Sequence, residues 1–508
     1  MGKLFVVPVL MLVSACSTEF TSLPCAVDSD CDHGAVCELR AAQPVCVQAA
    51  DAPIIIGQSS PFTGSNQALG VGMKLGIQLA FDEQNAAGGI RGRQLKLVIR
   101  DDGYDPLQAE ANARVLVNAQ PSNAPPRCPN TATPVSNGAL PPVMVPVSTT
   151  ALERGPDAVL AMLGNVGTPT AVRAAPVAIE AGTLFFGAFT GATTLLRDTS
   201  AGPCAQYIFN VRASYGQEAR ATMEYFLNRG VTDYRALISF DQNDTFGNAG
   251  YSGLVAAYVA ERGEFPSQAD PTTPIARFRY TRNDVNSVPV AAVATEAYLA
   301  SLLQTFPNGT VGVGIMMTDT YGASSTYIQH LRTWQYANDT QQTDLKKATR
   351  LVLHFSNVSF VGPNALAEEL VSAGTVATPN GPMALTNDVA VSQVVPNYQT
   401  DLSDVVQRYN ALVAADGAAP GFTSLEGYIS ARVFIGGLLN HQGPFTPEGL
   451  IKAFETLPDL ELGIGANAGF SATNHQYSQS VWGTVIQPDG GFKDLYFWTV
   501  GSPIQFFQ

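Results

Sequence analysis

The chain has 508 residues, of which 46% are hydrophobic and 14% charged, so it is long enough for several domains and too apolar for an intrinsically disordered protein. Its formal net charge of −14 argues against nucleic acid or an anionic membrane surface as the partner.

The first residues predict export. Lys3 precedes an apolar stretch, residues 4–12, that is too short to span a bilayer. The tetrapeptide VSAC, which ends at Cys16, is similar to a bacterial lipobox; an ordinary signal peptide with an incidental cysteine is the alternative. We therefore expect residues 1–16 to be a lipoprotein signal peptide. Lipidation of Cys16 would hold the protein in the periplasm or at the cell surface, on a bacterial membrane.

A cysteine-rich segment, residues 17–52, follows the signal. It contains Cys25, Cys31, Cys37 and Cys46. Export favours disulfides over a zinc site with His33, because the CxxC spacing typical of zinc is absent. Four cysteines allow three pairings, and the sequence leaves the choice open. Cys128 and Cys204 remain, and we expect them to pair with each other.

From residue 53 onward, strand and helix patterns alternate. Residues 53–60 and 93–102 are expected to be strands, and residues 69–89 and 105–119 helices, the first ending at Gly88-Gly89. Residues from about 120 to 156 are rich in proline, asparagine and threonine, which predicts a surface insertion.

The alternation resumes after the insertion. A strand over 157–164, a helix from Thr168 and a strand over 183–189 are followed by a second set of elements from residue 216 onward. A helix over 424–439 is predicted to start with the capping box Thr423-x-x-Glu426. Such alternation predicts parallel sheets in two sets, each large enough for a lobe.

Enzyme signatures are mostly missing. The sequence contains no GxSxG, HExxH, GxxxxGK[ST] or GxGxxG pattern, and its five histidines lack ligand spacing. We therefore predict no enzymatic activity, no cofactor and no metal.

The stretch GNVGTPTAV contains a candidate ligand site. Thr168 is expected to be the N-cap of a helix and Pro169 its first residue. The Thr168 hydroxyl, the backbone N–H groups and the helix dipole could hold a carboxylate. Thr446-Pro447 carries the same pattern and is expected only to start a helix. Thr168, however, follows a strand of a parallel sheet, at the end where such sheets bind ligands.

Several stretches point to a family: IIIGQSSPFTGSNQALGVGMKLGIQLAFDEQNAAGGIRGRQLKLVIRDDGYDP, GNVGTPTAVRAAPVAIEAGTLFFGAFTGATTLLRD, FNVRASYGQE, FDQNDTFGNAGYSGL and FTSLEGYISARVFIGGLL. From about Pro53 to its C-terminus the chain resembles the type I periplasmic binding proteins of branched-chain amino acid ABC transporters. The resemblance implies an α/β fold of two doubly wound parallel-sheet lobes joined by a three-strand hinge. Lobe 1 would comprise 53–212 plus 394–478, and lobe 2 would comprise 213–393 plus 479–508.

The resemblance also implies where the ligand binds. In lobe 1, the Thr168 hydroxyl would hold the ligand carboxylate, and the 189–191 loop would face the ligand. Aromatic residues of lobe 2 would close over it. The full implied set is Leu69, Gly167, Thr168, Phe189, Thr190, Gly191, Tyr215, Phe246, Tyr321, Ser359 and Phe422.

One departure from the family pattern concerns the ligand's charge. Relatives that bind α-amino acids use an acidic residue of the second lobe to meet the ammonium, whereas this chain has HFSNVSFVG there, with Asn357 and Ser359 but no acid. Another acid could serve instead: Asp241, Asp244 or Asp319. Otherwise the ligand is not an α-amino acid, and an apolar carboxylate or an amide would fit.

The function that the sequence favours is solute binding. We expect a lipid-anchored extracytoplasmic protein that passes a small amino acid-like or apolar carboxylate ligand to an ABC permease. The alternative is a receptor lipoprotein that senses its ligand and feeds a signalling partner. A third hypothesis is that the protein is an exported enzyme with the same fold.

Overall fold

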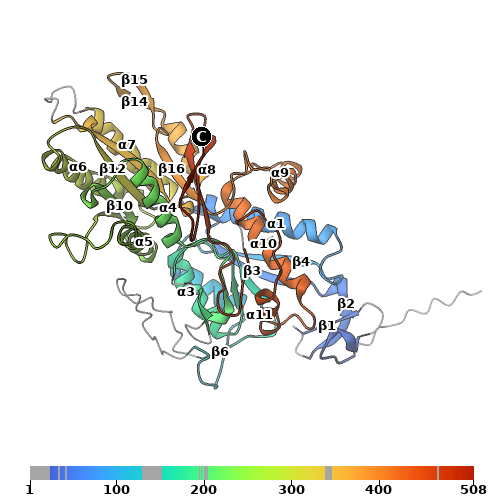
Figure 1. Cartoon of the computed structure of the whole chain (residues 1–508). Coiled ribbons are helices and arrows are strands. Elements are labelled where there is room, and N and C mark those ends of the chain that lie inside the picture. The colour runs from blue at the N-terminus through green and yellow to red at the C-terminus, as the bar shows by residue number, and fades with distance from the viewer. Residues whose placement is uncertain are drawn as a thin grey trace, which may run out of the picture.

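The computed structural model describes residues 23–31, 35–39, 43–128, 151–193, 195, 197–199, 204–337, 346–465 and 468–507. Cys16 and the predicted signal peptide lie outside this part of the chain. Figure 1 shows two α/β bodies, with the cysteine-rich module at the end of the first body that is remote from the second. None of the described helices combines the length and the apolar character needed to cross a bilayer.

The cysteine-rich module is a small hairpin that is cross-linked by two disulfides. Strands β1 (Ala35–Glu38) and β2 (Val45–Gln48) pair antiparallel, between the 3₁₀ turns η1 (Asp28–Asp30) and η2 (Ala49–Asp51). The disulfides are Cys25–Cys37 and Cys31–Cys46, which settles the pairing that the sequence left open. Two ion pairs fasten the module to the first body, Arg91–Asp28 at 3.3 Å and Arg93–Glu38 at 3.5 Å.

The first body is built on a sheet whose described strands run parallel in the order β4-β3-β7-β8-β9. They are β3 (Ile54–Ser60), β4 (Leu95–Asp101), β7 (Ala161–Leu163), β8 (Leu184–Phe186) and β9 (Ile208–Phe209). Its helices are α1 (Gln67–Ala86), α2 (Pro106–Leu116), α3 (Thr168–Glu180), α9 (Asp404–Asp416), α10 (Phe422–Asn440) and α11 (Pro447–Glu455). The predicted helix end at Gly88-Gly89 is confirmed, because α1 stops at Ala86 and both glycines have positive φ.

Helices α1 and α10 pack closely although they lie far apart in sequence. A Cβ atom on Gly76 would overlap the Ser424 carbonyl, and one on Gly427 would lie 2.5 Å from the Met73 carbonyl oxygen. The predicted capping box at Thr423 is wrong: α10 begins at Phe422, with Gly421 as its N-cap. The physical reason is that Glu426 forms a buried ion pair with Arg212 and does not reach back to the helix start.

The predicted insertion is anchored where it leaves the first body. Cys128 is disulfide-bonded to Cys204, as expected. The Glu180 carboxylate accepts hydrogen bonds from the backbone N–H groups of Arg127 and Cys128, at 2.8 and 3.0 Å. Short strands β5 (Gln120–Pro121) and β6 (Leu152–Glu153) pair at its base, and residues 129–150 lie outside the described chain.

The second body is built on a mixed sheet whose described strands follow the order β11-β10-β12-β13-β16-β17-β18-β19. Its first five members are parallel and its last three antiparallel. They are β10 (Leu237–Gln242), β11 (Ala276–Tyr280), β12 (Val311–Thr318), β13 (Leu351–Asn357), β16 (Val389–Gln393), β17 (Ser480–Ile486), β18 (Phe492–Thr499) and β19 (Gln505–Phe506).

Helices cover both faces of this second sheet. Helices α4 and α5 pack together on one face, and α6, α7 and α8 lie on the other. The helices are α4 (Tyr215–Asn228), α5 (Thr245–Arg262), α6 (Val288–Thr305), α7 (Tyr321–Ala337) and α8 (Pro363–Ala373). A hairpin of β14 (Thr375–Thr378) and β15 (Gly381–Ala384) follows α8. Short 3₁₀ turns are η4 (Ala205–Tyr207), η5 (Tyr234–Ala236), η6 (Val285–Ser287), η9 (Ala348–Arg350) and η10 (Ser359–Val361).

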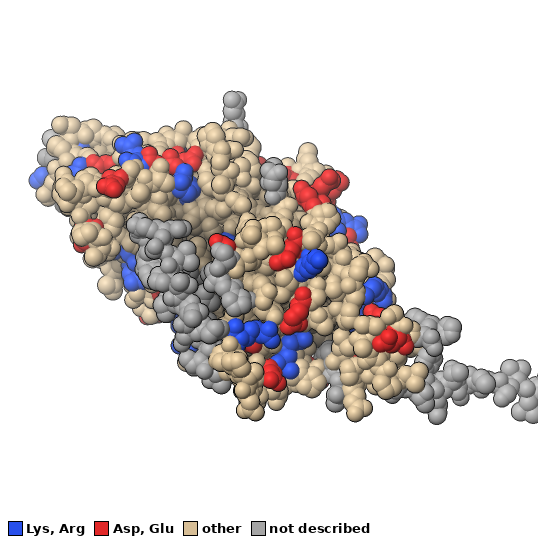
Figure 2. Space-filling model, turned by 60° about the horizontal axis from the view of Figure 1, so that its bottom comes forward, with Lys and Arg blue, Asp and Glu red and all other residues tan. Residues whose placement is uncertain are grey.

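The chain crosses between the two bodies after β9, after β16 and before β17. The first and last crossings run side by side: the Asn210 N–H donates to the His475 carbonyl at 2.8 Å, and the Ser478 N–H donates to the Val211 carbonyl at 2.9 Å. On the face in Figure 2, basic side chains lie among acidic ones without forming a broad basic patch, as the net charge suggests.

Candidate functional site

The start of α3 lies at the carboxyl end of β7. The helix begins at Thr168, and its N-cap is Gly167 rather than the predicted Thr168. Gly167 has a φ of 102°, and a Cβ atom there would overlap the Tyr104 ring, so this position requires glycine. The N–H groups of the first helical turn have no acceptor within the helix, which leaves them for a ligand.

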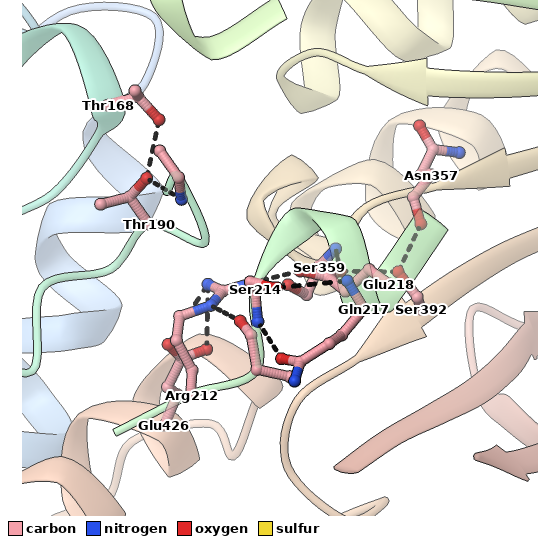
Figure 3. Close-up of polar contacts among 12 residues, drawn as sticks. Thr168, Thr190, Arg212, Ser214, Gln217, Glu218, Asn357, Ser359, Ser392 and Glu426 are labelled. Carbon is pink, nitrogen blue, oxygen red and sulfur yellow. Dashed lines mark hydrogen bonds and ion pairs between the residues drawn. The ribbon is translucent and has the colours of Figure 1, made fainter. Parts of the chain in front are cut away.

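Two hydroxyl groups meet at this helix start. Thr168 Oγ1 and Thr190 Oγ1 lie 2.7 Å apart in a hydrogen bond, and Thr190 Oγ1 also accepts the Ala192 N–H at 3.2 Å (Figure 3). Both threonines are buried. Because only one hydroxyl can donate within the pair, the other keeps a proton for an acceptor such as a carboxylate oxygen.

A group of aromatic rings lies where the two bodies meet. The Phe360 ring of the second body is 5.1 Å from that of Phe189 and 6.0 Å from that of Tyr104, both of the first body. Phe246 lies 4.7 Å from Phe360 and 5.3 Å from Tyr215. Phe360 and Tyr104 were not predicted as site residues, because each contacts these rings only through the tertiary structure.

Tyr215 is fixed in place by the loop that contains Gly191 and by the N-cap of its own helix. Its N–H donates to the Gly191 carbonyl at 2.8 Å, and a Cβ atom on Gly191 would lie 2.6 Å from the Tyr215 nitrogen. Ser214 caps α4 and forms a capping box with Gln217. Burial raises the pKa of Tyr215 to about 12, so its hydroxyl stays protonated at physiological pH.

Replacing Ser214 with alanine is expected to lower the free energy of unfolding by about 1 kcal/mol, because the N-cap hydrogen bond to Gln217 is lost. Urea unfolding followed by circular dichroism measures this cost. Ser214→Thr is the matched control, since threonine retains the capping hydroxyl and should restore most of the stability. Equal stability of the alanine variant and the native chain would contradict the prediction.

Two of the remaining predicted residues also meet across the two bodies. A Cβ atom on Gly362 would lie 2.7 Å from Leu69 Cδ2 and 3.2 Å from Tyr321 Cδ1, so Leu69 of α1 lies beside Tyr321 of α7. Phe422, in contrast, packs against Tyr398 and Phe492 at 5.0 Å each and joins a separate aromatic group.

A buried ionic cluster connects the two bodies beside the aromatic rings. The Arg212 guanidinium pairs with Glu218 at 2.7 Å and with Glu426 at 3.3 Å (Figure 3). It also donates to the Ser359 hydroxyl, which places this predicted residue in the cluster. Arg212 Cζ lies 5.4 Å from the centre of the Phe189 ring.

The two glutamates of this cluster differ in their partners. The second oxygen of Glu218 accepts the Ser359 N–H at 2.7 Å and the Ser392 hydroxyl at 2.6 Å. The polar partner of Glu426 is Arg212. Burial raises the pKa of Glu426 to about 7, against the opposing effect of Arg212. Burial by itself lowers the pKa of Arg212. The negative charges of Glu426 and Glu218 have the larger effect together, so its pKa is raised above the ordinary value. Sequence reasoning missed this cluster, although FNVRASYGQE contains two of its members.

Comparison with known proteins agrees with this architecture. A model of the family described as periplasmic binding protein matches residues 53–136. The chain is 42% identical over 66 residues to a Leu/Ile/Val-binding protein homolog of Brucella abortus, and 43% identical over 67 residues to an amino acid binding protein of Pseudomonas aeruginosa. Each alignment covers 13% of this chain and only 18% of the relative.

A solved structure extends the similarity over most of the chain. The crystal structure of a possible leucine/isoleucine/valine-binding protein from Rhodopirellula baltica SH 1 aligns with 28% identity and a TM-score of 0.65, covering 88% of this chain and 96% of that one. The chain therefore has the fold of the type I periplasmic binding proteins. This fold places the carboxyl ends of the strands of both bodies at the junction that holds the hydroxyl pair.

Asp319 of the second body is a buried carboxyl group without a hydrogen-bond partner among the described residues. The nearby Ser324 hydroxyl donates instead to Asn357 Oδ1 at 2.8 Å. Burial raises the pKa of Asp319 well above its ordinary value of 3.8. In the unfolded chain the group would ionise near pH 4, so the native state holds this proton more tightly than the unfolded state does.

The stability of the native chain is therefore expected to fall, relative to that of Asp319→Asn, as the pH rises above about 4. The loss approaches about 1.4 kcal/mol per pH unit until the folded-state pKa is reached. Urea unfolding of both proteins between pH 4 and pH 8 measures the difference. Parallel pH profiles would show that Asp319 is not held protonated.

Proposed function

We propose that this protein is an extracytoplasmic solute-binding protein of an ABC transporter, and that it binds an amino acid or a related small carboxylate or amide between two lobes. In this proposal the first body, residues 53–212 plus 394–478, is lobe 1, and the second, residues 213–393 plus 479–508, is lobe 2. Lipidation at Cys16 would hold it on the membrane, where a permease receives the ligand.

The observation that supports the proposal most directly is the hydroxyl pair of Thr168 and Thr190 at the start of α3. A carboxylate there would accept hydrogen bonds from a hydroxyl and from the first-turn N–H groups, at the positive end of the helix dipole. The Phe246 and Phe360 rings of the opposite body would cover its apolar part. Leu69 and Tyr321 would meet as the lobes close, which favours the closed state when ligand is bound.

The relatives also support a small ligand with a carboxylate. The two curated proteins are described as a Leu/Ile/Val-binding homolog and an amino acid binding protein. The segment that the family model matches contains β3 and α1. The proposed lipid anchor at Cys16 is consistent with the fold. The cysteine-rich module that follows Cys16 is held against the first body by ion pairs of Arg91 and Arg93.

A thermal-shift screen of amino acids and small carboxylates on the full chain tests this proposal. A ligand at 100 times its dissociation constant should stabilise the native state by about 2.7 kcal/mol. Thr168→Ala should weaken the best carboxylate about 10- to 150-fold, the value of one charge-assisted hydrogen bond. Calorimetric titration measures the affinity.

Thr446→Ala is the matched control for that experiment. Thr446 also precedes a proline at a helix start, but there its hydroxyl caps α11 through the Gly449 N–H at 3.1 Å. The control should lose about 1 kcal/mol of stability and keep its ligand affinity. If Thr168→Ala bound the ligand as tightly as the native chain does, Thr168 would not be part of the binding site.

A further inference from the structure

The buried ionic cluster at the junction of the two bodies carries a surplus charge. Arg212 lies in the crossing that follows β9, Glu218 in α4 of the second body and Glu426 in α10 of the first (Figure 3). The guanidinium pairs with both carboxylates, and the three side chains are at most 5% exposed. Two carboxylates that share one guanidinium leave one negative charge buried and uncompensated.

This surplus arises because the two bodies are in contact. The Phe360 ring of the second body lies 5.1 Å from the Phe189 ring of the first. Glu218 and Glu426 belong to different bodies, so a rotation that separated the bodies would move the two carboxylates apart and admit water between them. A buried net charge is unfavourable, so a proton that neutralises it favours the contact.

Hydrogen bonds decide which of the two carboxylates takes the proton. Glu218 accepts from Arg212 Nη2 at 2.7 Å, from the Ser359 N–H at 2.7 Å and from the Ser392 hydroxyl at 2.6 Å. The Glu426 oxygens lie farther from their donor, at 3.3 and 3.5 Å from Arg212 Nη1. Because close donors stabilise the charged form of a carboxylate, the proton goes to Glu426.

The neighbouring charges agree with this assignment. Burial raises the pKa of Glu426 to about 7, and the charge of Glu218 adds to this effect while Arg212 opposes it. Tyr215, from α4, and Arg197, from the loop that follows β8, face Arg212. The Tyr215 hydroxyl stays protonated at physiological pH and brings no further charge.

We propose that closure of the two bodies is coupled to the uptake of one proton from solvent by Glu426, so that acidification favours the closed state. This inference rests on the proposed function and adds a regulation to the same junction. In an open cleft, water and the distance from Glu218 would return the pKa of Glu426 toward its ordinary value of 4.5. The proton's contribution to closure is therefore complete below that value and is lost as the pH rises through about 7.

Distances between spin labels on the two bodies test this coupling without any ligand. Leu439 of α10 and Val290 of α6 are 54% and 75% exposed, and each carries a label after replacement with cysteine. Pulsed electron spin resonance on the full chain measures the fractions of closed and open molecules. The ratio of closed to open molecules should be about 10-fold higher at pH 6 than at pH 8. Equal distance distributions at the two pH values would overturn the inference.

Two variants of the labelled chain identify the carboxylate. Glu426→Gln keeps the size of the side chain and removes its charge, so the ratio of closed to open molecules should be the same at both pH values. Glu218→Gln removes the other carboxylate and with it the surplus charge, so its ratio should also be independent of pH. A 10-fold response that persisted in either variant would contradict the proposed role of the pair.

Glu83→Gln is the matched control. Glu83 of α1 is a partly buried glutamate within the first body, and it pairs with two arginines, Arg408 at 2.6 Å and Arg432 at 3.2 Å. It carries no surplus negative charge, so this variant should keep the 10-fold response. Loss of the response here would assign the pH effect to the general loss of negative charge and would refute the coupling to Glu426.

Infrared difference spectra between the native chain and Glu426→Gln detect the proton itself. The carbonyl band of a protonated carboxyl group should be present in the native chain at pH 6 and about 10-fold weaker at pH 8. Absence of this band at pH 6 would show that Glu426 is ionised and that closure takes up no proton there.

The screen of amino acids and small carboxylates separates failure of this inference from failure of the proposed function. If a carboxylate binds but the label distances ignore pH, the proposed function stands and the proton coupling falls. If no small carboxylate or amide binds but the native chain still closes on acidification, the coupling stands and the proposed function falls.

Discussion

Replacing Arg212 with methionine is expected to lower the free energy of unfolding by about 3–5 kcal/mol. Arg212 is the shared partner of two buried glutamates, and its removal leaves Glu218 and Glu426 close together without a neutralising charge. Glu426 has its pKa at about 7 even with the arginine present, so the variant should take up a proton there at neutral pH. Urea unfolding at pH 6 and pH 8 measures the loss, which should be larger at pH 8.

The control for Arg212 is an arginine whose ion pair is open to water. Arg220 pairs with Glu261 at 2.5 Å, and its side chain is 38% exposed. Arg220→Met should cost less than about 1 kcal/mol, because water screens such a pair. Equal costs for the two variants would mean that Arg212 contributes through packing of its side chain and not through its charge.

Replacing Phe360 with alanine is expected to lower the free energy of unfolding by about 3–5 kcal/mol as well. The ring is fully buried and contacts rings of both bodies, so its loss leaves a cavity at their junction. The variant should also bind the best carboxylate from the screen more weakly. Thermal unfolding and calorimetric titration measure the two effects.

Phe422→Ala is the matched control for Phe360. Phe422 is similarly buried but packs with Tyr398 and Phe492, in a separate aromatic group. Its replacement should cost a similar amount of stability and leave ligand affinity unchanged. If Phe422→Ala lost affinity while Phe360→Ala kept it, the pocket would lie on the Phe422 side and our placement of the ligand would be wrong.

Much of the fold could be predicted from local patterns. The end of α1 at Gly88-Gly89 and the start of α11 at Thr446 depend on a few neighbouring residues, and both agree with the structure. The local pattern failed at Thr423-x-x-Glu426, where the spacing is typical of a capping box but the glutamate pairs with a distant arginine. Gly167 displaced Thr168 as the N-cap because only glycine fits beside Tyr104 at that φ.

The candidate site was predictable only in part. Thr168, Phe189 and Phe246 were expected there, the first from its helix-start pattern and all three through the family resemblance. Arg212 and Phe360 were not expected, because an arginine in a loop or a phenylalanine in a 3₁₀ turn has no spacing that reveals its partner. Phe422, expected near the pocket, lies in another aromatic group.

The sequence by itself determined the alternation of strands and helices, the small cysteine-rich module, and the excess of acidic over basic residues. These properties follow from composition and from periodicities that span a few residues. The tertiary structure alone decided which charges meet: Arg212 joins Glu218, six residues away, to Glu426, 214 residues away. Such contacts depend on how two sheets are joined by three crossings of the chain, and no local pattern encodes a distance of that kind.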